Sequence, residues 1–385
     1  MLLNKRHGFL DMKKIGIIAT HPIQYFNEFY VELSKKYDVT VFYSHRQTSS
    51  DELKTSFGLS FSWSEDLLDG YSYKFLKNRA KNKNVSTFFG CNNSQIYREI
   101  ADSEFDIFLV SGWHSLSYVQ AILACKITRT PVYVRTDSTL DEPKSKLTRF
   151  LKILTYPLLL KIPTGFLFVG KRSKAYLRHY GVKSNKLQFS PHSVGSKNFY
   201  PDKRASSNYP KNRSHIWRIL SFSALIKRKN IDNVIKACDE VTKQGYKVQF
   251  DIVGSGEMED ELRGLAAATE CIVNFHSFKN QDELRDYYAI SDILVLASSS
   301  ESWGLVVNEA MQCGVPALVS DRVGCAPDLI KRNTGRIFRA GDVSDLAFQM
   351  VDLMNATDVT SESVINHIKK YSVQSSIIAI DRLLE

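Results

Sequence analysis

The sequence lacks any pair of cysteines at C-x-x-C spacing, and no histidines stand at the spacing of a zinc finger. These absences argue against a structural zinc site, so we expect no metal in the protein. The six cysteines lie mostly in apolar stretches such as ILACKIT and IKACDEV. We interpret them as small buried residues of a protein in a reducing compartment.

Long apolar stretches are absent as well. Residues 1–14 are polar and charged, without the apolar core of a signal peptide, and Met12 is an alternative start. No run approaches the roughly 18 apolar residues that a membrane-spanning helix needs. We therefore expect a cytoplasmic protein.

The composition is that of a soluble globular protein with a basic surplus. The 385 residues suffice for two domains, and 43% of them are hydrophobic and 24% charged. The formal net charge of +10 favours an anionic partner, either a membrane surface or a phosphate-bearing substrate, although a soluble basic surface explains it equally well. No nucleic-acid-binding motif accompanies the charge, so we expect no nucleic acid.

Short apolar runs alternate with helical patterns along the first half of the chain. We predict buried parallel strands at 15–20, 39–44, 105–111, 131–135 and 165–170. This alternation is typical of a doubly wound α/β domain, which we assign to residues 1–195.

The alternation stops and then begins again. Residues 196–214 are rich in Lys, Asn, Ser and Pro and indicate a linker, and a second α/β domain follows over 215–369. Residues 370–385 form an amphipathic helix that we expect to pack back toward the first domain. Two Rossmann-like domains leave a cleft between the carboxyl ends of their sheets, and we expect the ligand to bind there. The further predicted strands are 217–224, 248–254, 272–275, 292–298 and 316–320, with helices beginning at Ile231, Glu257, Gln281 and Leu305.

The segment SSSESWGLVVNEAMQCGVP is the most informative part of the chain. It follows a predicted buried strand and opens a helix, so its free backbone amides and the helix dipole favour an anion. Gly304 allows close approach of a phosphate. Glu301 and Glu309 are placed to address two different parts of one extended ligand, the alternative being that Glu309 is only a solvated helix position.

This segment resembles the E-x7-E motif of the retaining group 1 glycosyltransferases of family 4, which have the GT-B architecture. The similarity runs over nearly the whole chain and includes SGWHSLSYVQAI, VGKRSKAYLRHYGV, SALIKRKNIDNVIKA and DIVGSGEMEDEL. The resemblance implies a metal-independent enzyme without a cofactor. An enzyme of this kind is expected to move a hexosyl group from a nucleotide-diphosphate sugar, a UDP- or GDP-sugar, to an acceptor hydroxyl with retention of configuration.

The resemblance also assigns roles within the motif. It implies that Glu301 hydrogen-bonds the hydroxyls of the donor sugar and that Glu309 holds the ribose. The amides of Gly304, Leu305 and Val306 are expected to hold the diphosphate.

The stretch SALIKRKN departs from the family at one position. The family has Gly-Arg-Leu here and a lysine a few residues later, and both cations neutralise the leaving diphosphate. Lys229 matches that lysine, but the arginine position is Ala224. Lys227 or Arg228 is a candidate substitute, and a solvated basic loop is the alternative reading.

The stretch VGSGEMEDEL contains only two glycines of a dinucleotide fingerprint, Gly254 and Gly256. The missing third glycine argues against a dehydrogenase. The resemblance implies that this loop approaches the nucleotide and that Phe278 lies near the base.

Several polar residues end strands of the first domain. His21 and Gln24 follow the first strand and are candidates for the acceptor side of the cleft. His114 follows a later strand at the position where the family has a histidine close to the donor sugar. Asp137 ends another strand and is a further acceptor candidate. The alternatives are structural loop histidines and a capping aspartate.

Residues 144–164, KSKLTRFLKILTYPLLLKIPT, combine basic and bulky apolar side chains. They are suited to an anionic membrane surface, and equally to a helix packed on the first domain. A lipid-linked acceptor would favour the membrane.

We therefore predict a glycosyltransferase of polysaccharide or lipopolysaccharide biosynthesis, peripheral to the cytoplasmic face of the membrane. A sugar-nucleotide epimerase is the alternative enzyme. A non-catalytic nucleotide-sugar-binding subunit is the other alternative, which the alanine at position 224 makes conceivable. The sequence specifies neither the donor sugar and its base, nor the acceptor, nor the oligomeric state.

Overall fold

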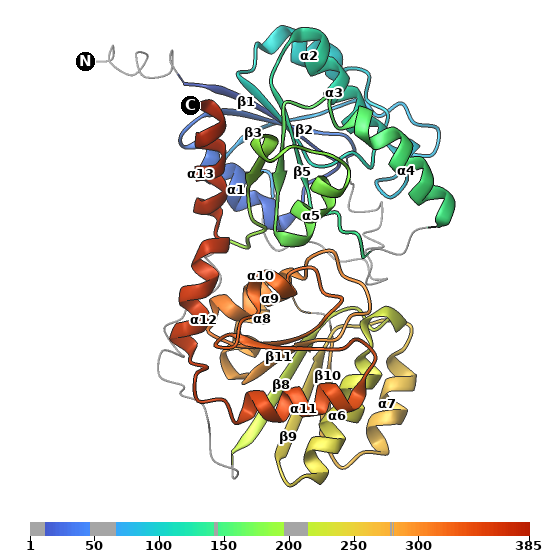
Figure 1. Cartoon of the computed structure of the whole chain (residues 1–385), viewed down its shortest axis with the longest axis vertical. Helices are drawn as coiled ribbons and strands as arrows, with labels where there is room; N and C mark the ends of the chain where they lie inside the picture. The colour runs from blue at the N-terminus through green and yellow to red at the C-terminus, as the bar shows by residue number, and fades with distance from the viewer. Residues whose placement is uncertain (1–11, 47–66, 142–144, 196–214, 278, 280) are drawn as a thin grey trace, which may run out of the picture.

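The computed structural model describes residues 12–46, 67–141, 145–195, 215–277, 279 and 281–385. They form two lobes, each built around its own parallel β-sheet and covered by helices on both faces (Figure 1). We call the lobe around the first sheet the N-terminal domain and the other the C-terminal domain.

The sheet of the N-terminal domain has seven strands in the order β3-β2-β1-β4-β5-β6-β7, all parallel. Its helices are α1 (Gln24–Ser34), α2 (Ile96–Ser103), α3 (Leu116–Thr128), α4 (Lys146–Leu159) and α5 (Lys171–His179), with short 3₁₀ helices η1 (Phe88–Gly90) and η2 (Ser184–Lys186). The strands are β1 (Lys14–Ala19), β2 (Asp38–Tyr43), β3 (Ser72–Phe75), β4 (Ile107–Val110), β5 (Val132–Thr136), β6 (Gly165–Phe168) and β7 (Leu187–Phe189).

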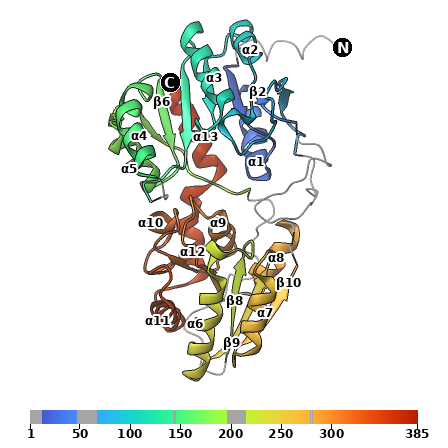
Figure 2. The same cartoon turned by 90° about the vertical axis from the view of Figure 1, so that its right-hand side faces the viewer.

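The sheet of the C-terminal domain has six parallel strands in the order β10-β9-β8-β11-β12-β13. Figure 2 shows β8, β9 and β10 side by side. The strands are β8 (Ile216–Phe222), β9 (Lys247–Val253), β10 (Ile272–His276), β11 (Ile293–Leu296), β12 (Ala317–Ser320) and β13 (Gly335–Phe338). The helices are α6 (Ile231–Lys243), α7 (Glu259–Ala267), α8 (Gln281–Ile290), α9 (Leu305–Gln312), α10 (Ala326–Leu329), α11 (Val343–Met354), α12 (Ser361–Ile368) and α13 (Val373–Leu384), with η4 (Lys227–Lys229) and η5 (Lys369–Tyr371).

The predicted fold class, two doubly wound α/β domains, is confirmed by these sheets. The predicted strands agree with the observed ones to within about two residues at most ends, because each central strand is a run of buried apolar side chains. Burial on both faces explains this composition: in β1, every residue from Ile15 to Ala19 is buried.

Aromatic packing on one face of the first sheet depends on a glycine in β1. A side-chain carbon at Gly16 would lie 2.3 Å from a ring carbon of Phe108 in β4. The glycine therefore leaves room for the aromatic cluster of Phe42, Phe105 and Phe108 on that face of the sheet.

The last helix returns to the N-terminal domain. Helix α12 packs on α9 of the C-terminal domain, whereas α13 packs on α1 and contributes Ile377 and Ile380 to the core beneath β1 (Figure 1). The hydroxyl of Tyr37 donates to Asp381 of α13 at 2.6 Å. The chain thus crosses between the domains a second time, which limits how they move apart.

Candidate functional site

Both sheets reverse their strand order at one internal point, and both points face the gap between the domains. In the first sheet the reversal lies between β1 and β4, and in the second between β8 and β11. Loops at the carboxyl ends of such strands diverge and leave a crevice, where ligands of doubly wound folds bind. The predicted site residues follow these four strands or their neighbours.

The loop between β11 and α9 ends in an uncapped helix start. Gly304 adopts φ 100° and ψ 66°, and a side-chain carbon there would lie 2.8 Å from Leu296. No side chain caps α9. In the part of the chain that the structure describes, the amides of Leu305 and Val306 have no hydrogen-bond acceptor. These amides and the positive end of the helix dipole favour a bound anion.

The structure brings Lys229 and Glu301 into direct contact, although they are separated by 72 positions in the sequence. The ammonium group of Lys229 donates to Oε2 of Glu301, and the two side chains are only 12% and 19% exposed. Nη1 of Arg228 lies 3.8 Å from the same carboxylate oxygen and donates to the carbonyl of Ser300. Two cations and one carboxylate therefore meet next to the start of α9.

The position of the missing family arginine lies inside the protein. Ala224 is buried, and it stands where the chain leaves β8. Lys227 is exposed, whereas Arg228 reaches back to Ser300 and Glu301. Of the two candidate substitutes, only Arg228 has a described contact with the site.

Glu309 is fully buried on α9, as its apolar neighbours in the sequence indicate. The hydroxyl of Tyr288 donates to its Oε2 at 2.7 Å. Burial and the nearby Glu309 carboxylate raise the pKa of Tyr288 well above its usual value, so the phenol keeps its proton. The role of Glu309 toward a ribose stays a prediction, and it requires that the ligand reach a carboxylate that is covered here.

Gly254 has a packing role that the sequence alone does not specify. Its φ is 147°, and a side-chain carbon would lie 2.0 Å from the carbonyl oxygen of Ser223. The loop after β9 therefore lies directly against the loop after β8, held by the amide of Leu225 donating to Ser255 at 2.8 Å. The contact of Gly254 with the donor stays a prediction. Phe278, predicted to lie near the base, is outside the described residues.

Trp303 packs between the two domains instead of facing an open gap. It is 3% exposed, and its ring would clash with any side chain at Gly170, whose added carbon would lie 2.5 Å away. Its Nε1 donates to Oδ1 of Asn308, and Nδ2 of Asn308 donates to the carbonyl of His192 at 3.1 Å. Helix α9 is thereby tied to the N-terminal domain.

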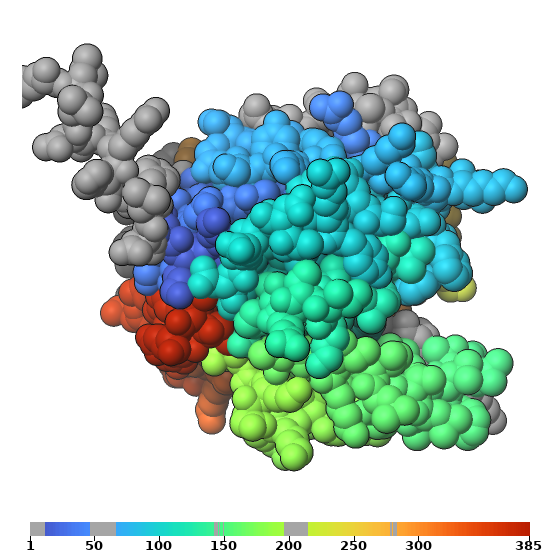
Figure 3. All heavy atoms as spheres, turned by 90° about the horizontal axis from the view of Figure 1, so that it is seen from above, coloured from blue at the N-terminus to red at the C-terminus, as the bar shows by residue number. Residues whose placement is uncertain are grey.

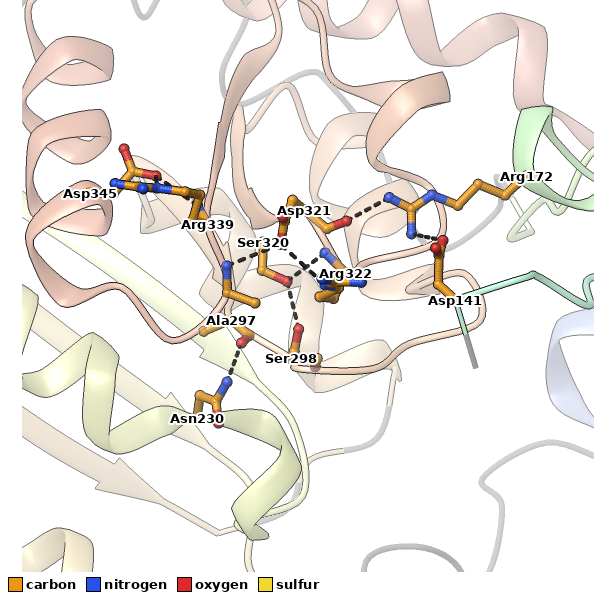
Figure 4. Close-up of polar contacts among 11 residues, drawn as sticks. Asp141, Arg172, Asn230, Ala297, Ser298, Ser320, Asp321, Arg322, Arg339 and Asp345 are labelled. Atoms are coloured by element: carbon orange, nitrogen blue, oxygen red, sulfur yellow. Dashed lines mark hydrogen bonds and ion pairs between the residues drawn. The ribbon is translucent and has the colours of Figure 1, made fainter. Parts of the chain in front are cut away.

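A second contact between the domains is made by α5 (Figure 4). Arg172 donates to the carbonyl of Asp321 at 2.6 Å and forms an ion pair with Asp141 at 2.9 Å. The neighbouring amide of Lys171 donates to both carboxylate oxygens of Asp328. The start of α5 therefore holds the loops after β12 in a fixed position relative to the first sheet.

A pocket of about 360 Å³ opens at the switch point of the first sheet. His21, His114 and Asp137, three of the four predicted residues of this domain, line it. Gln24 does not line it, because it begins α1 and its side chain is buried. Further lining residues are Trp113, Tyr118, Arg135 and His192.

The pocket holds its histidines neutral near pH 7. Burial, together with the nearby His45, lowers the pKa of His21 to about 4. Burial also lowers the pKa of His114, despite the opposing Asp137. Burial alone would raise the pKa of Asp137, but the neighbouring His192, whose Nε2 lies 3.8 Å from the carboxylate, and Ser302 lower it below the usual range. The pocket thus offers neutral imidazoles and one carboxylate, which suits the recognition of hydroxyl groups.

Arg135 and His192 were not predicted as site residues. Arg135 stands two positions before Asp137 in an extended segment, so the period of two places both side chains on the same face, a signal that the sequence contains. His192 belongs to the stretch that leaves β7 toward the second domain, and no local pattern marks it.

The described residues contain neither a metal-binding cluster nor a helix that could cross a membrane. Within the described ranges there is no group of three His, Cys, Asp or Glu side chains suited to a metal ion. None of the described helices has the length and apolar composition to cross a membrane. All six cysteines are buried, and none of them forms a disulfide bond.

Comparison with known proteins gives matches to sugar-transferring enzymes. Residues 202–371 match the family model of the glycosyl transferases group 1. An amylovoran biosynthesis glycosyltransferase, AmsK of Erwinia amylovora, is 32% identical over 139 residues, which are 34% of this chain and 34% of that protein. The matching segments span between 34% and 44% of the length of three curated relatives.

Solved structures resemble the whole chain. The lipopolysaccharide outer core galactosyltransferase WaaB has a TM-score of 0.71 at 14% identity, covering 96% of this chain and 98% of that one. Anabaena HepE in complex with UDP and glucose has a TM-score of 0.65 at 15% identity, with 97% and 99% covered. At 14% and 15% sequence identity, these similarities establish the fold alone.

Proposed function

Because the chain belongs to the group 1 glycosyl transferases and has the GT-B fold, we propose that it moves a hexosyl group from a nucleotide-diphosphate sugar to an acceptor hydroxyl. The transfer retains the anomeric configuration. The observation that carries this proposal is the contact of Lys229 with Glu301 beside the uncapped start of α9. This cluster lies at the switch point of the C-terminal sheet.

The diphosphate and the sugar of the donor each have a partner in this cluster. The diphosphate binds the amides of Leu305 and Val306 at the start of α9, where Gly304 allows close approach. Lys229 and Arg228 neutralise its charge, so Arg228 takes the role of the arginine that Ala224 replaces. Glu301 exchanges part of its contact with Lys229 for hydroxyls of the sugar.

The reaction needs stabilisation of the leaving group more than a separate base. The bond from the anomeric carbon to the diphosphate oxygen breaks while the acceptor oxygen attacks from the same face. The acceptor proton passes to the departing diphosphate. Lys229 and the helix start stabilise the negative charge that grows on that leaving group.

The acceptor binds in the pocket of the N-terminal domain. Its hydroxyls hydrogen-bond the neutral His21 and His114 and the carboxylate of Asp137. Ser302 of the C-terminal domain is among the groups that lower the pKa of Asp137, so the acceptor pocket adjoins the donor loop. This proximity supports direct transfer between the two halves of the site.

The class of substrates follows from the similar proteins. HepE is described in complex with UDP and glucose, AmsK acts in amylovoran biosynthesis, and WaaB acts on lipopolysaccharide. For this chain we assign a UDP- or GDP-sugar as donor. The acceptor is a saccharide of a surface polysaccharide or lipopolysaccharide under assembly.

Helix α4 supports a peripheral position on a membrane. Tyr156 packs it on Trp113 and Tyr180 of the domain core, but one side of the helix stays uncovered. Residues 144–164 contain no Asp or Glu, so an anionic lipid surface suits this face better than a neutral one. The exposed apolar side chains of the helix are Leu147, Phe150, Leu151, Ile153, Leu154, Leu158 and Leu159.

The proposal is tested by incubating the protein with UDP- and GDP-sugars and analysing the products. Slow release of free sugar and nucleoside diphosphate, abolished by Glu301→Ala in a folded variant, supports the transferase. A changed sugar on an intact nucleotide would indicate an epimerase instead. Binding without any turnover, even with acceptor saccharides present, would indicate a binding subunit.

A further inference from the structure

The acceptor pocket contains a cation that the proposed transfer does not use. Nη2 of Arg135 donates to the carbonyl of Pro191 at 2.8 Å and lies 3.4 Å from Nδ1 of His192. Its guanidinium carbon lies 5.1 Å from the centre of the Phe26 ring. Within the ranges that the structure describes, Arg135 forms no ion pair at 4.0 Å or less.

The contacts of Arg135 leave its positive charge without an ion-pair partner among the described residues. Burial lowers the pKa of Arg135 to about 10, so the group is still charged at neutral pH. His192 supplies no negative charge, and burial together with the field of Arg135 lowers the pKa of its imidazole. The Asp137 carboxylate stabilises this charge from beyond ion-pair distance, so the planar fork of arginine, which matches a carboxylate or phosphate, has no directly bonded anion among the described residues.

The segment that contributes one residue to the wall of the same pocket is strongly basic. The segment after β3 contributes Val85 to the pocket wall. It exposes four cations in seven residues, and no ion pair is described for any of them: Lys77, Arg79, Lys81 and Lys83.

This basic segment has a defined conformation. Oδ1 of Asn84 accepts hydrogen bonds from the amides of Ser86 and Thr87, and Nδ2 of Asn78 donates to the carbonyl of Gly90. The light-blue atoms after β3 and the green atoms of α4 project on the same side of the molecule (Figures 1 and 3). The cations therefore belong to a segment of defined conformation that reaches the pocket wall at Val85.

We infer that the acceptor is anionic: a phosphate or carboxylate on the acceptor sugar, or on its immediate neighbour, pairs with Arg135. The basic segment after β3 attracts that charge toward the pocket. Asp137, already engaged by His192 and Ser302, serves the acceptor hydroxyl instead. This inference rests on the proposed function, because it takes the pocket to be the acceptor site.

The anion has two sources that present the same chemistry to Arg135. One is a phosphate that links the acceptor saccharide to a lipid, and the other is the carboxylate of a uronic acid. The experiment therefore measures binding of three probes by calorimetry: glucuronic acid, glucose 6-phosphate, and vesicles of phosphatidylcholine with a polyprenyl phosphate. Glucose and plain phosphatidylcholine vesicles are the neutral counterparts.

The variants are Arg135→Gln and the double variant Lys81→Ser/Lys83→Ser. Lys126→Ser/Lys183→Ser is the matched control, because it removes two exposed lysines that belong neither to the pocket lining nor to the basic segment. We expect at least one anionic probe to bind the wild type at least tenfold more tightly than its neutral counterpart. Arg135→Gln should remove that preference, the loop variant should weaken it and reduce its salt dependence, and the control should leave it unchanged.

Binding of UDP and GDP to the same variants separates two kinds of failure. If nucleotide binds but no anionic probe is preferred, or Arg135→Gln keeps the preference, the anionic acceptor is refuted and the transferase proposal stands. If neither nucleotide binds the wild-type protein, the proposed function itself fails. A response confined to the vesicles identifies the lipid phosphate, and one confined to glucuronic acid identifies the carboxylate.

Discussion

Replacing Lys229 by alanine removes the cation that we place on the leaving diphosphate. At an effective dielectric constant of about 20, two unit charges 4 Å apart interact by about 4 kcal/mol. That figure is an upper bound here, because Glu301 already neutralises part of the charge of Lys229. A charge-assisted hydrogen bond contributes about 1.5–3 kcal/mol, so Lys229→Ala should weaken nucleoside diphosphate binding about ten- to a hundredfold.

The same substitution has a separate effect on the folded protein. It leaves the Glu301 carboxylate, only 19% exposed, with Arg228 as the nearest cation at 3.8 Å. We expect a loss of about 1–3 kcal/mol of unfolding free energy, which still leaves a folded variant to assay. Denaturant unfolding of the free protein measures this loss, and calorimetry with UDP and GDP measures the loss of affinity.

Lys227 provides the matched control, because it lies in the same 3₁₀ helix and its side chain is exposed. Lys227→Ala removes the same charge from the same loop, yet it should change nucleotide affinity by no more than about two- to threefold, as expected of a screened surface charge. If both variants bind UDP and GDP as the wild type does, Lys229 has no part in holding the diphosphate.

Three further predictions concern α9, the acceptor pocket and α4. Gly304→Ala should lower the unfolding free energy by about 1–3 kcal/mol and weaken nucleotide binding, because an alanine is strained at φ 100°. The pKa of His21 is lowered in the folded state to about 4, so the unfolded chain binds more protons between pH 6.5 and 4 and stability falls as the pH drops through this range. His21→Gln should reduce that fall by up to about 3 kcal/mol. Leu154→Asp combined with Leu158→Asp should reduce sedimentation with anionic vesicles, because both leucines are exposed on α4.

Controls for these predictions exist within the same chain. Gly264→Ala in α7 meets no atom within 4 Å and should raise stability by about 0.5–1 kcal/mol. Ile127→Asp also places a charge at an exposed apolar position, but outside α4, and should leave vesicle binding unchanged. Equal effects of the test and control variants would contradict the reasoning on α9 and α4. If His21→Gln leaves the pH dependence of stability unchanged, the lowered pKa of His21 in the pocket is contradicted.

The central strands could be predicted from the sequence, and three peripheral ones could not. β1, β4 and β11 are buried on both faces and therefore consist of apolar residues. The missed strands are β3, β7 and β13. β3 is mostly exposed, β7 is three residues long, and β13 begins with glycine and arginine, so none has an apolar run. Each lies at an edge of its sheet, where burial does not dictate composition.

The donor half of the site was more predictable than the acceptor half. Lys229 and Glu301 follow two strands that are neighbours in the sheet, and the carboxyl ends of parallel strands meet at one edge. The inward packing of Trp303 and the position of His192 depend on how the two domains are placed against each other. No local pattern encodes that placement, so these contacts appear only in the structure.

The central claim is that Glu301 hydrogen-bonds the hydroxyls of the donor sugar while Lys229 binds the diphosphate. It is tested most directly by calorimetry of the wild type and Glu301→Gln with UDP-glucose and UDP, and with GDP-mannose and GDP. The neutral glutamine releases Lys229, so the bare nucleoside diphosphate should bind as tightly as before or more tightly, while the matching sugar nucleotide loses about tenfold or more in affinity. Equal changes for a sugar nucleotide and its bare nucleotide, or no change for either, would contradict the account.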